Sequence, residues 1–148
     1  MGIDLHTLRL TGGRAAAEWA MEQENWAIIG TKQDFNQDIH KLTGALRKLG
    51  RAVHMVCLRS TRLENIDLNA HETIEDIDSQ VDVVILLGDL DHWDLVSRIS
   101  QRMQWYGDIK IIWSQSEMND ERWVSEMYDY GIAVVDNCPI ETIMRFQP

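Results

Sequence analysis

The sequence is poor in the residues that small extracellular and fibrous proteins use in quantity. Its 148 residues include two cysteines, Cys57 and Cys138, two prolines and nine glycines. Two cysteines cannot form the disulfide framework of a small extracellular domain, so the expected setting is the reducing cytoplasm. No Pro/Gly-rich linker, internal repeat or low-complexity stretch divides a chain of ordinary domain length. We therefore expect a single domain over 1–148, with 1–13 as a loose N-terminal arm.

Long apolar runs and an excess of basic residues are also absent. No run approaches the roughly 20 residues of a membrane span, and Asp4, His6 and Arg9 interrupt the apolar core that a signal peptide requires. Lys and Arg number 14 against 24 Asp and Glu, for a formal net charge of −10. This balance argues against a nucleic-acid-binding surface, and any anionic ligand would need a local positive site.

Five short segments combine apolar and β-branched residues with little alternation between apolar and polar positions. They are residues 26–30, 52–58, 81–87, 109–113 and 132–135. Runs of this kind are typical of strands that are covered on both faces, as in parallel sheets.

Helical patterns separate these segments. Ile39, Leu42, Leu46 and Leu49 recur at three- and four-residue spacing, which places them on one helical face. The other segments with a helical pattern are 14–22, 71–77, 95–103 and 124–128, and three of the predicted helices run into a glycine, at Gly50, Gly107 and Gly131. Strands alternating with helices predict a doubly wound α/β domain, with helices on both faces of a five-stranded, mostly parallel sheet.

The loop after the first predicted strand is a candidate phosphate site. Gly30 permits close backbone approach, Thr31 and Lys32 follow it, and the next helix would offer free N–H groups at its N-terminus. A plain strand-to-helix turn explains the loop equally well, because it contains neither a G-x-G-x-x-G fingerprint nor a P-loop. After the second predicted strand, Arg59 and Arg62 suit a phosphorylated ribose, although a solvated basic loop is the more common situation.

Other chemistry is weakly indicated. The five histidines lack zinc-ligand spacing, and no G-x-S-x-G elbow is present. Asp89 and Asp91 follow the third predicted strand and suit the start of a helix better than a metal site. Trp93, Trp105 and Trp123 lie on or beside helices, where core packing is the favoured interpretation and an oligomer contact is the alternative.

Several local patterns occur together in one order. They are Ile28-Ile29-Gly30, Val81-Asp82-Val83-Val84, Trp113-Ser114-Gln115 and the stretch Gly131–Pro139. In this order they resemble the small CoA-binding-domain proteins, whose Rossmann-like domain is shared with the CoA-binding half of succinyl-CoA synthetase. The resemblance spans about residues 14–146, and its most specific element is the closing Val135-Asp136-Asn137-Cys138-Pro139.

The resemblance implies CoA as the ligand. The family pattern implies that Gly30, Thr31 and Lys32 meet the pyrophosphate and that Arg59 lies near the adenosine phosphate. It also implies that Cys138 and Pro139 lie beside the pantetheine end. From the charge, the apolar runs and the histidine spacing, we expect no metal ion, membrane or nucleic-acid partner. The leading hypothesis is therefore a non-catalytic module that binds CoA or a related nucleotide.

Two further hypotheses stay open at this stage. The chain departs from the family pattern at Cys57-Leu58 and Leu87-Gly88, and it carries Asp34 and Asp38 near the first loop. These departures favour a degenerate domain that acts through protein–protein contacts, including contacts within a homo-oligomer. The third hypothesis is an enzyme or redox protein that uses Cys138, although a buried structural cysteine is more common.

Overall fold

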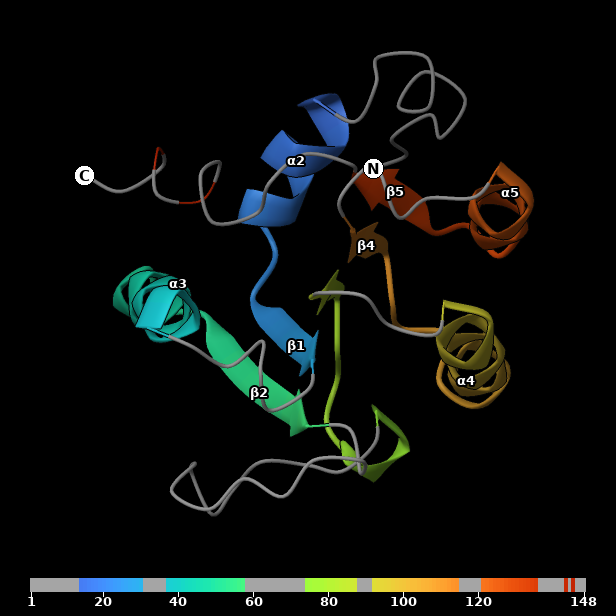
Figure 1. Ribbon diagram of the computed structural model, residues 1–148, viewed down its shortest axis with the longest axis horizontal. Coiled ribbons are helices and arrows are strands. Elements are labelled where there is room, and N and C mark those ends of the chain that lie inside the picture. The colour runs from blue at the N-terminus through green and yellow to red at the C-terminus, as the bar shows by residue number, and fades with distance from the viewer. Residues whose placement is uncertain are drawn as a thin grey trace.

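The structure is a computed structural model that describes residues 14–30, 37–57, 74–87, 92–114 and 121–135, and positions 143 and 145. Five strands and four α-helices alternate along the described chain (Figure 1). The elements are α2 (Arg14–Met21), β1 (Asn25–Gly30), α3 (Gln37–Lys48), β2 (Ala52–Cys57), the 3-10 turn η1 (Ile74–Asp76), β3 (Val83–Leu86), α4 (His92–Trp105), β4 (Ile111–Trp113), α5 (Glu121–Asp129) and β5 (Ala133–Val135).

The five strands form one sheet in the order β2-β1-β3-β4-β5. Every neighbouring pair of strands is parallel, which confirms the prediction of a mostly parallel sheet. The register sets Gly30 opposite Cys57 and Ile29 opposite Leu86. The carboxyl ends of β1, β2 and β3 therefore lie next to one another.

The two faces of the sheet pack against different helices (Figure 1). Along β1, the side chains of Trp26 and Ile28 join the cluster under α2 and α3, whereas Ala27 and Ile29 join the cluster under η1, α4 and α5. Successive side chains of a strand point to opposite faces, and here both faces are covered. This arrangement explains why the strands read as continuous apolar runs.

Glycines end two of the helices with the same geometry. Gly50 follows α3 with a φ of 79°, and Gly131 follows α5 with a φ of 83°. After α3, the Gly50 N–H donates to the Arg47 carbonyl at 3.0 Å and the Arg51 N–H donates to the Leu46 carbonyl at 3.0 Å. This pair of bonds is a Schellman motif, which confirms the predicted helix end.

Two sequence expectations differ from the structure in detail. The segment predicted as a short helix over 71–77 is a single 3-10 turn at 74–76 in its described part, with Ile74 and Ile77 buried beneath α4. Core packing is right for Trp123, which is 1% exposed, and wrong for Trp105, which is 63% exposed. No helix in the described part of the chain is long and apolar enough to cross a membrane.

Candidate functional site

The strand order creates a topological switch point between β1 and β3. From β1 the chain passes through α3 to β2, on one side of the sheet, while from β3 it passes through α4 to β4, on the other side (Figure 1). The helices that follow β1 and β3 therefore lie on opposite faces of the sheet. In open α/β sheets, ligands bind outside the carboxyl ends of the strands at this point.

Gly30 is the strand-terminal residue at the switch point. It is buried, and its strand position lies between Cys57 of β2 and the end of β3. The Leu87 N–H donates to the carbonyl of Ile29 at 2.9 Å, which extends the pairing of β1 and β3 to their ends. The backbone around Gly30 is therefore fixed on both sides.

The carboxyl ends of β4 and β5, farther along this edge, are also joined by a backbone hydrogen bond. The Ser114 N–H, after β4, donates to the Val135 carbonyl of β5 at 2.8 Å. Among the described residues that end the strands or directly follow them, Gly30, Cys57, Leu87, Ser114 and Val135 are uncharged, whereas Asp136 follows β5 in the sequence and lies outside the described residues. At the described ends of β1 to β4 a phosphate meets no carboxylate of these terminal residues, so this part of the edge is compatible with an anionic ligand.

Gly30 is the predicted ligand residue that the structure describes, and it stands at the switch point as expected. The other predicted ligand residues lie outside the described residues: Thr31, Lys32, Arg59, Cys138 and Pro139. Arg62, Asp34, Asp89 and Asp91 lie outside them as well, and of Asp38 only the backbone, within α3, is described. In the described segments, no group of three or more His, Cys, Asp or Glu residues could hold a metal ion.

Trp113, the first residue of the Trp113-Ser114-Gln115 motif, belongs to the core. Its ring packs against Trp26 with centroids 6.3 Å apart and planes tilted by 37°, and both side chains are fully buried. The Trp26 indole N–H donates to the Gln23 carbonyl at 2.9 Å. One of the residues that carry the family resemblance therefore stabilises the sheet rather than contacting a ligand.

The opposite, amino end of the sheet contains a buried arginine that the sequence did not single out. Arg102 is 1% exposed and donates to the carboxylate of Asp108 from Nε at 3.2 Å and from Nη2 at 2.8 Å. Its remaining N–H groups donate to three carbonyl oxygens, those of Ile74 at 3.0 Å, Ile77 at 2.7 Å and Ser79 at 2.9 Å. All five guanidinium donors are therefore satisfied.

A second buried charge lies at the same end. Asp82 is 2% exposed and accepts hydrogen bonds from the Asn25 side chain at 2.9 Å, Gln80 at 2.7 Å and Lys110 Nζ at 3.3 Å. Burial by itself raises the pKa of Asp82, but the hydrogen bonds from Gln80 and Asn25 and the charge of Lys110 outweigh burial. The pKa of this carboxyl therefore lies below its ordinary value, and Asp82 stays ionised between the ends of β1, β3 and β4.

Comparison with known protein families gives one match. A sequence model described as a CoA binding domain matches residues 24–142, which include all five strands. No curated protein matches this chain.

Solved structures with the same fold match over almost the whole chain. A crystal structure of Prb, described as the PH1109 protein redesigned for binding, has a TM-score of 0.67 and 18% identity and covers 97% of this chain and 92% of its own. A hypothetical protein from Pyrococcus horikoshii OT3 has a TM-score of 0.64 and 18% identity, and the match covers 97% of this chain and 92% of that protein. A Thermus thermophilus protein described as cell-free ID.343 has a TM-score of 0.64 and 20% identity, and the match covers 97% of this chain and 98% of that protein. At these identities the likeness shows the fold.

Proposed function

The chain belongs to the CoA-binding-domain family, and we propose that it is a non-catalytic module that binds CoA or a closely related nucleotide at the carboxyl end of its sheet. The observation that carries this proposal is the strand order β2-β1-β3-β4-β5. Along this edge, Arg59 follows β2, the Gly30-Thr31-Lys32 loop follows β1, and Cys138 and Pro139 follow β5. Ribose phosphate, pyrophosphate and pantetheine occur in the same order along CoA.

Each residue has a chemical reason for its proposed role. Gly30 leaves room for the pyrophosphate to approach the backbone, and Lys32 and the N–H groups that precede α3 supply positive potential. Arg59 offers planar, charged donors to the ribose phosphate. When bound, CoA supplies a thiol that carries acyl groups, and Cys138 and Pro139 lie beside this end in the proposed arrangement.

A hydrogen-bonded serine–histidine pair lies in the described part of the chain, with Ser79 Oγ and His54 Nε2 3.1 Å apart. Ser79 is exposed and precedes β3, so this pair lies away from the carboxyl ends of the strands. A catalytic pair for a CoA-bound substrate would have to reach the opposite edge of the sheet.

Native mass spectrometry and isothermal titration calorimetry of the purified chain with CoA and NAD test the proposal. We expect one CoA per chain and much weaker binding of NAD. Gly30→Val should abolish CoA binding because its side chain occupies the approach path of the phosphate. Since Gly30 is buried, Gly30→Ala provides a milder variant in case valine perturbs the fold.

Gly44→Ala is the matched control, because no heavy atom lies within 4 Å of a Cβ added at this position in α3. It should bind CoA as the wild-type chain does. Binding of NAD but not CoA, or CoA binding that both Gly30 variants leave unchanged, would contradict the proposed site. If no nucleotide binds, the module does not retain the ligand of its family.

A further inference from the structure

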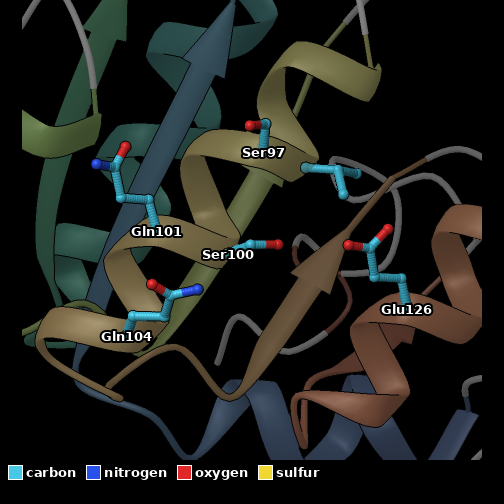
Figure 2. A pocket seen from close by; sticks show the side chains of 6 residues that line it. Ser97, Ser100, Gln101, Gln104 and Glu126 are labelled. Atoms are coloured by element: carbon cyan, nitrogen blue, oxygen red, sulfur yellow. The ribbon is translucent and has the colours of Figure 1, made fainter.

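The helices on the two faces of the sheet differ in how their basic side chains are paired. On the face covered by α4 and α5, Arg98 pairs with Glu75 at 2.9 Å and Arg102 pairs with Asp108 at 2.8 Å. A groove of about 460 Å³ between these two helices is lined by serine, glutamine and valine side chains of α4 and by Glu126 of α5 (Figure 2). Both arginines of α4 therefore have carboxylate partners within the chain.

Helix α3, on the other face of the sheet, carries basic side chains without such partners (Figure 1). Lys41, Arg47 and Lys48 are exposed, and within the described part of the chain their side chains form no ion pair or hydrogen bond. Residues 39–57 contain no aspartate or glutamate, although the whole chain carries a formal net charge of −10. This acidic protein therefore concentrates positive charge on one helix.

The charged residues share one side of α3. His40 and Arg47 lie two turns apart in one row along the helix, and Lys41 and Lys48 form the next row. All four are exposed, whereas the apolar side chains of residues 40–48 are buried. The helix dipole favours basic residues in the last turn, which accounts for Arg47 and Lys48 but not for Lys41. We call these four residues the α3 basic face.

Gly44 lies at the centre of the α3 basic face, three or four positions along the chain from each of its members. Glycine inside a helix costs about 0.5–1 kcal/mol relative to alanine. A Cβ added here would have no heavy atom within 4 Å, so no packing contact in the chain requires a glycine. The missing side chain leaves the helix backbone open to a partner that approaches between the basic side chains.

The composition of this face distinguishes between anionic partners. A helix that binds a membrane surface inserts exposed apolar side chains, and the described part of α3 exposes none. A bilayer or a nucleic acid is an extended polyanion, which meets the field of the whole chain and is repelled by its net charge. From His40 to Lys48 the face is only about 12 Å long. This length matches two turns of another helix that carries carboxylates three and four residues apart.

We propose that the α3 basic face docks an acidic helix of another protein, which crosses α3 at Gly44. Carboxylates of that helix pair with Lys41, Arg47 and Lys48, which have no carboxylate partner in their own chain. Packed helices have axes about 8–10 Å apart, and the glycine permits this approach without displacing the basic side chains around it.

Amide NMR of the isotope-labelled full chain, titrated with a synthetic peptide, tests this inference. The peptide is an alanine-rich helix with glutamates at i, i+4 spacing. We expect the amides of Lys41, Gly44 and Lys48 to shift with a common Kd, and we expect this Kd to rise with salt because screening weakens exposed ion pairs. The same peptide with glutamine in place of glutamate should cause no shift.

Two variants separate charge from shape. Lys41→Gln/Lys48→Gln should raise the peptide Kd about tenfold, since it removes two of the proposed ion pairs. Gly44→Leu keeps every charge and should also raise the Kd, because the new side chain occupies the crossing point. The matched control, Arg98→Gln/Arg122→Gln, removes the same charge from α4 and α5 and should change the Kd by less than about twofold. Far-UV circular dichroism should show the same helix content for every variant.

The absence of peptide-induced shifts in α3 at low salt overturns the inference. Equal increases in Kd from the two double variants also overturn it, because net charge alone then governs binding. Shifts of the α3 amides by duplex DNA or by vesicles of anionic phospholipid, under conditions in which the peptide causes none, would assign the face to that polyanion instead. CoA affinity should stay unchanged in both double variants, so a chain that binds the peptide but not CoA contradicts only the proposed function.

Discussion

The two ends of the central sheet differ in what their polar groups do. At the amino end, the Arg102 and Asp82 side chains are buried and hydrogen-bonded to several partners each. At the carboxyl end, the residues that end the strands are uncharged, and strand pairing holds Gly30 in place at the switch point. Buried charge therefore stabilises the amino end of the sheet, whereas the proposed ligand site lies at the carboxyl end.

The largest expected effect comes from Arg102, whose loss would remove two charge-assisted hydrogen bonds to the Asp108 carboxylate and the hydrogen bonds to the carbonyl oxygens of Ile74, Ile77 and Ser79. We expect Arg102→Met to lower the free energy of unfolding by about 3–5 kcal/mol, as measured by urea denaturation. Arg98→Met on the same helix is the matched control. Arg98 pairs with Glu75 at 2.9 Å, and its side chain is 38% exposed, so its removal should cost at most about 1 kcal/mol.

Equal losses of unfolding free energy in the Arg102→Met and Arg98→Met variants would contradict the stabilising role of buried charge at the amino end. The Arg102 network would then contribute no more than a surface ion pair, and its burial would have little energetic consequence. CoA affinity offers a second readout, because the folded fraction of Arg102→Met should bind CoA as tightly as the wild-type chain. A large loss of affinity in that folded fraction would show that the two ends of the sheet are coupled.

At the carboxyl end, Arg59 should distinguish CoA from dephospho-CoA, which lacks the ribose phosphate. A charge-assisted hydrogen bond of this kind is worth about 1.5–3 kcal/mol, or on the order of tenfold to a hundredfold in affinity. Calorimetry with both ligands should show this preference, and Arg59→Ala should reduce it while Arg62 retains part of the contact. Equal affinity for both ligands, unchanged by Arg59→Ala, would mean that this arginine does not recognise the phosphate.

Asp82 gives the amino end a predictable pH dependence. Its pKa is lower in the folded chain than its ordinary value, so its contribution to stability is present above the ordinary pKa and is lost as the pH falls through the folded pKa. Asp82→Asn should cost about 1–3 kcal/mol at neutral pH. Its stability should also decline less steeply than that of the wild-type chain below about pH 4.

Urea denaturation at several pH values measures this difference. Asp129→Asn, which removes an exposed carboxylate from α5, is the control and should follow the wild-type curve closely. Parallel curves for Asp82→Asn and the wild-type chain would show that the interactions of Asp82 do not favour its ionised form.

The smallest effect concerns α3, the helix that connects the two ends of the sheet. Gly44→Ala should raise the free energy of unfolding by about 0.5–1 kcal/mol, because Gly44 lies inside the helix and a Cβ there has open space. Gly50→Ala should lower it by about 1 kcal/mol or more, since the φ of 79° disfavours a side chain. Thermal unfolding followed by circular dichroism should show a higher melting temperature for Gly44→Ala and a lower one for Gly50→Ala. A higher melting temperature for both variants would contradict the geometry at the end of α3.

Local signals in the sequence predicted most of the fold. Apolar runs such as 26–30 and 81–87 predicted strands, because burial on both faces removes the alternation of apolar and polar residues. Gly50 and Gly131 predicted helix ends, because a positive φ favours glycine. The role of Arg102 could not be predicted in this way. Its partners are carbonyl oxygens and an aspartate that come together only when η1 folds under α4, and no sequence spacing indicates that arrangement.

The candidate site was predictable in position but not in detail. Alternating strands and helices predict a doubly wound parallel sheet, and the observed strand order places Gly30 at its switch point. The roles of Thr31, Lys32, Arg59, Cys138 and Pro139 depend on loop conformations that no periodic pattern determines, so they stay predictions. Trp105 shows the same limit on a helix, because spacing alone did not distinguish an exposed tryptophan from a buried one such as Trp123.

Titration of the isotope-labelled chain with CoA, followed by amide NMR shifts, tests most directly whether the carboxyl end binds the ligand. The account predicts that the amides of Gly30, Leu87 and Ser114 shift with a common dissociation constant while those of Val81 and Lys110, at the amino end, stay in place. Shifts confined to Val81 and Lys110, or to the groove between α4 and α5, would contradict a CoA site at the carboxyl end of the sheet.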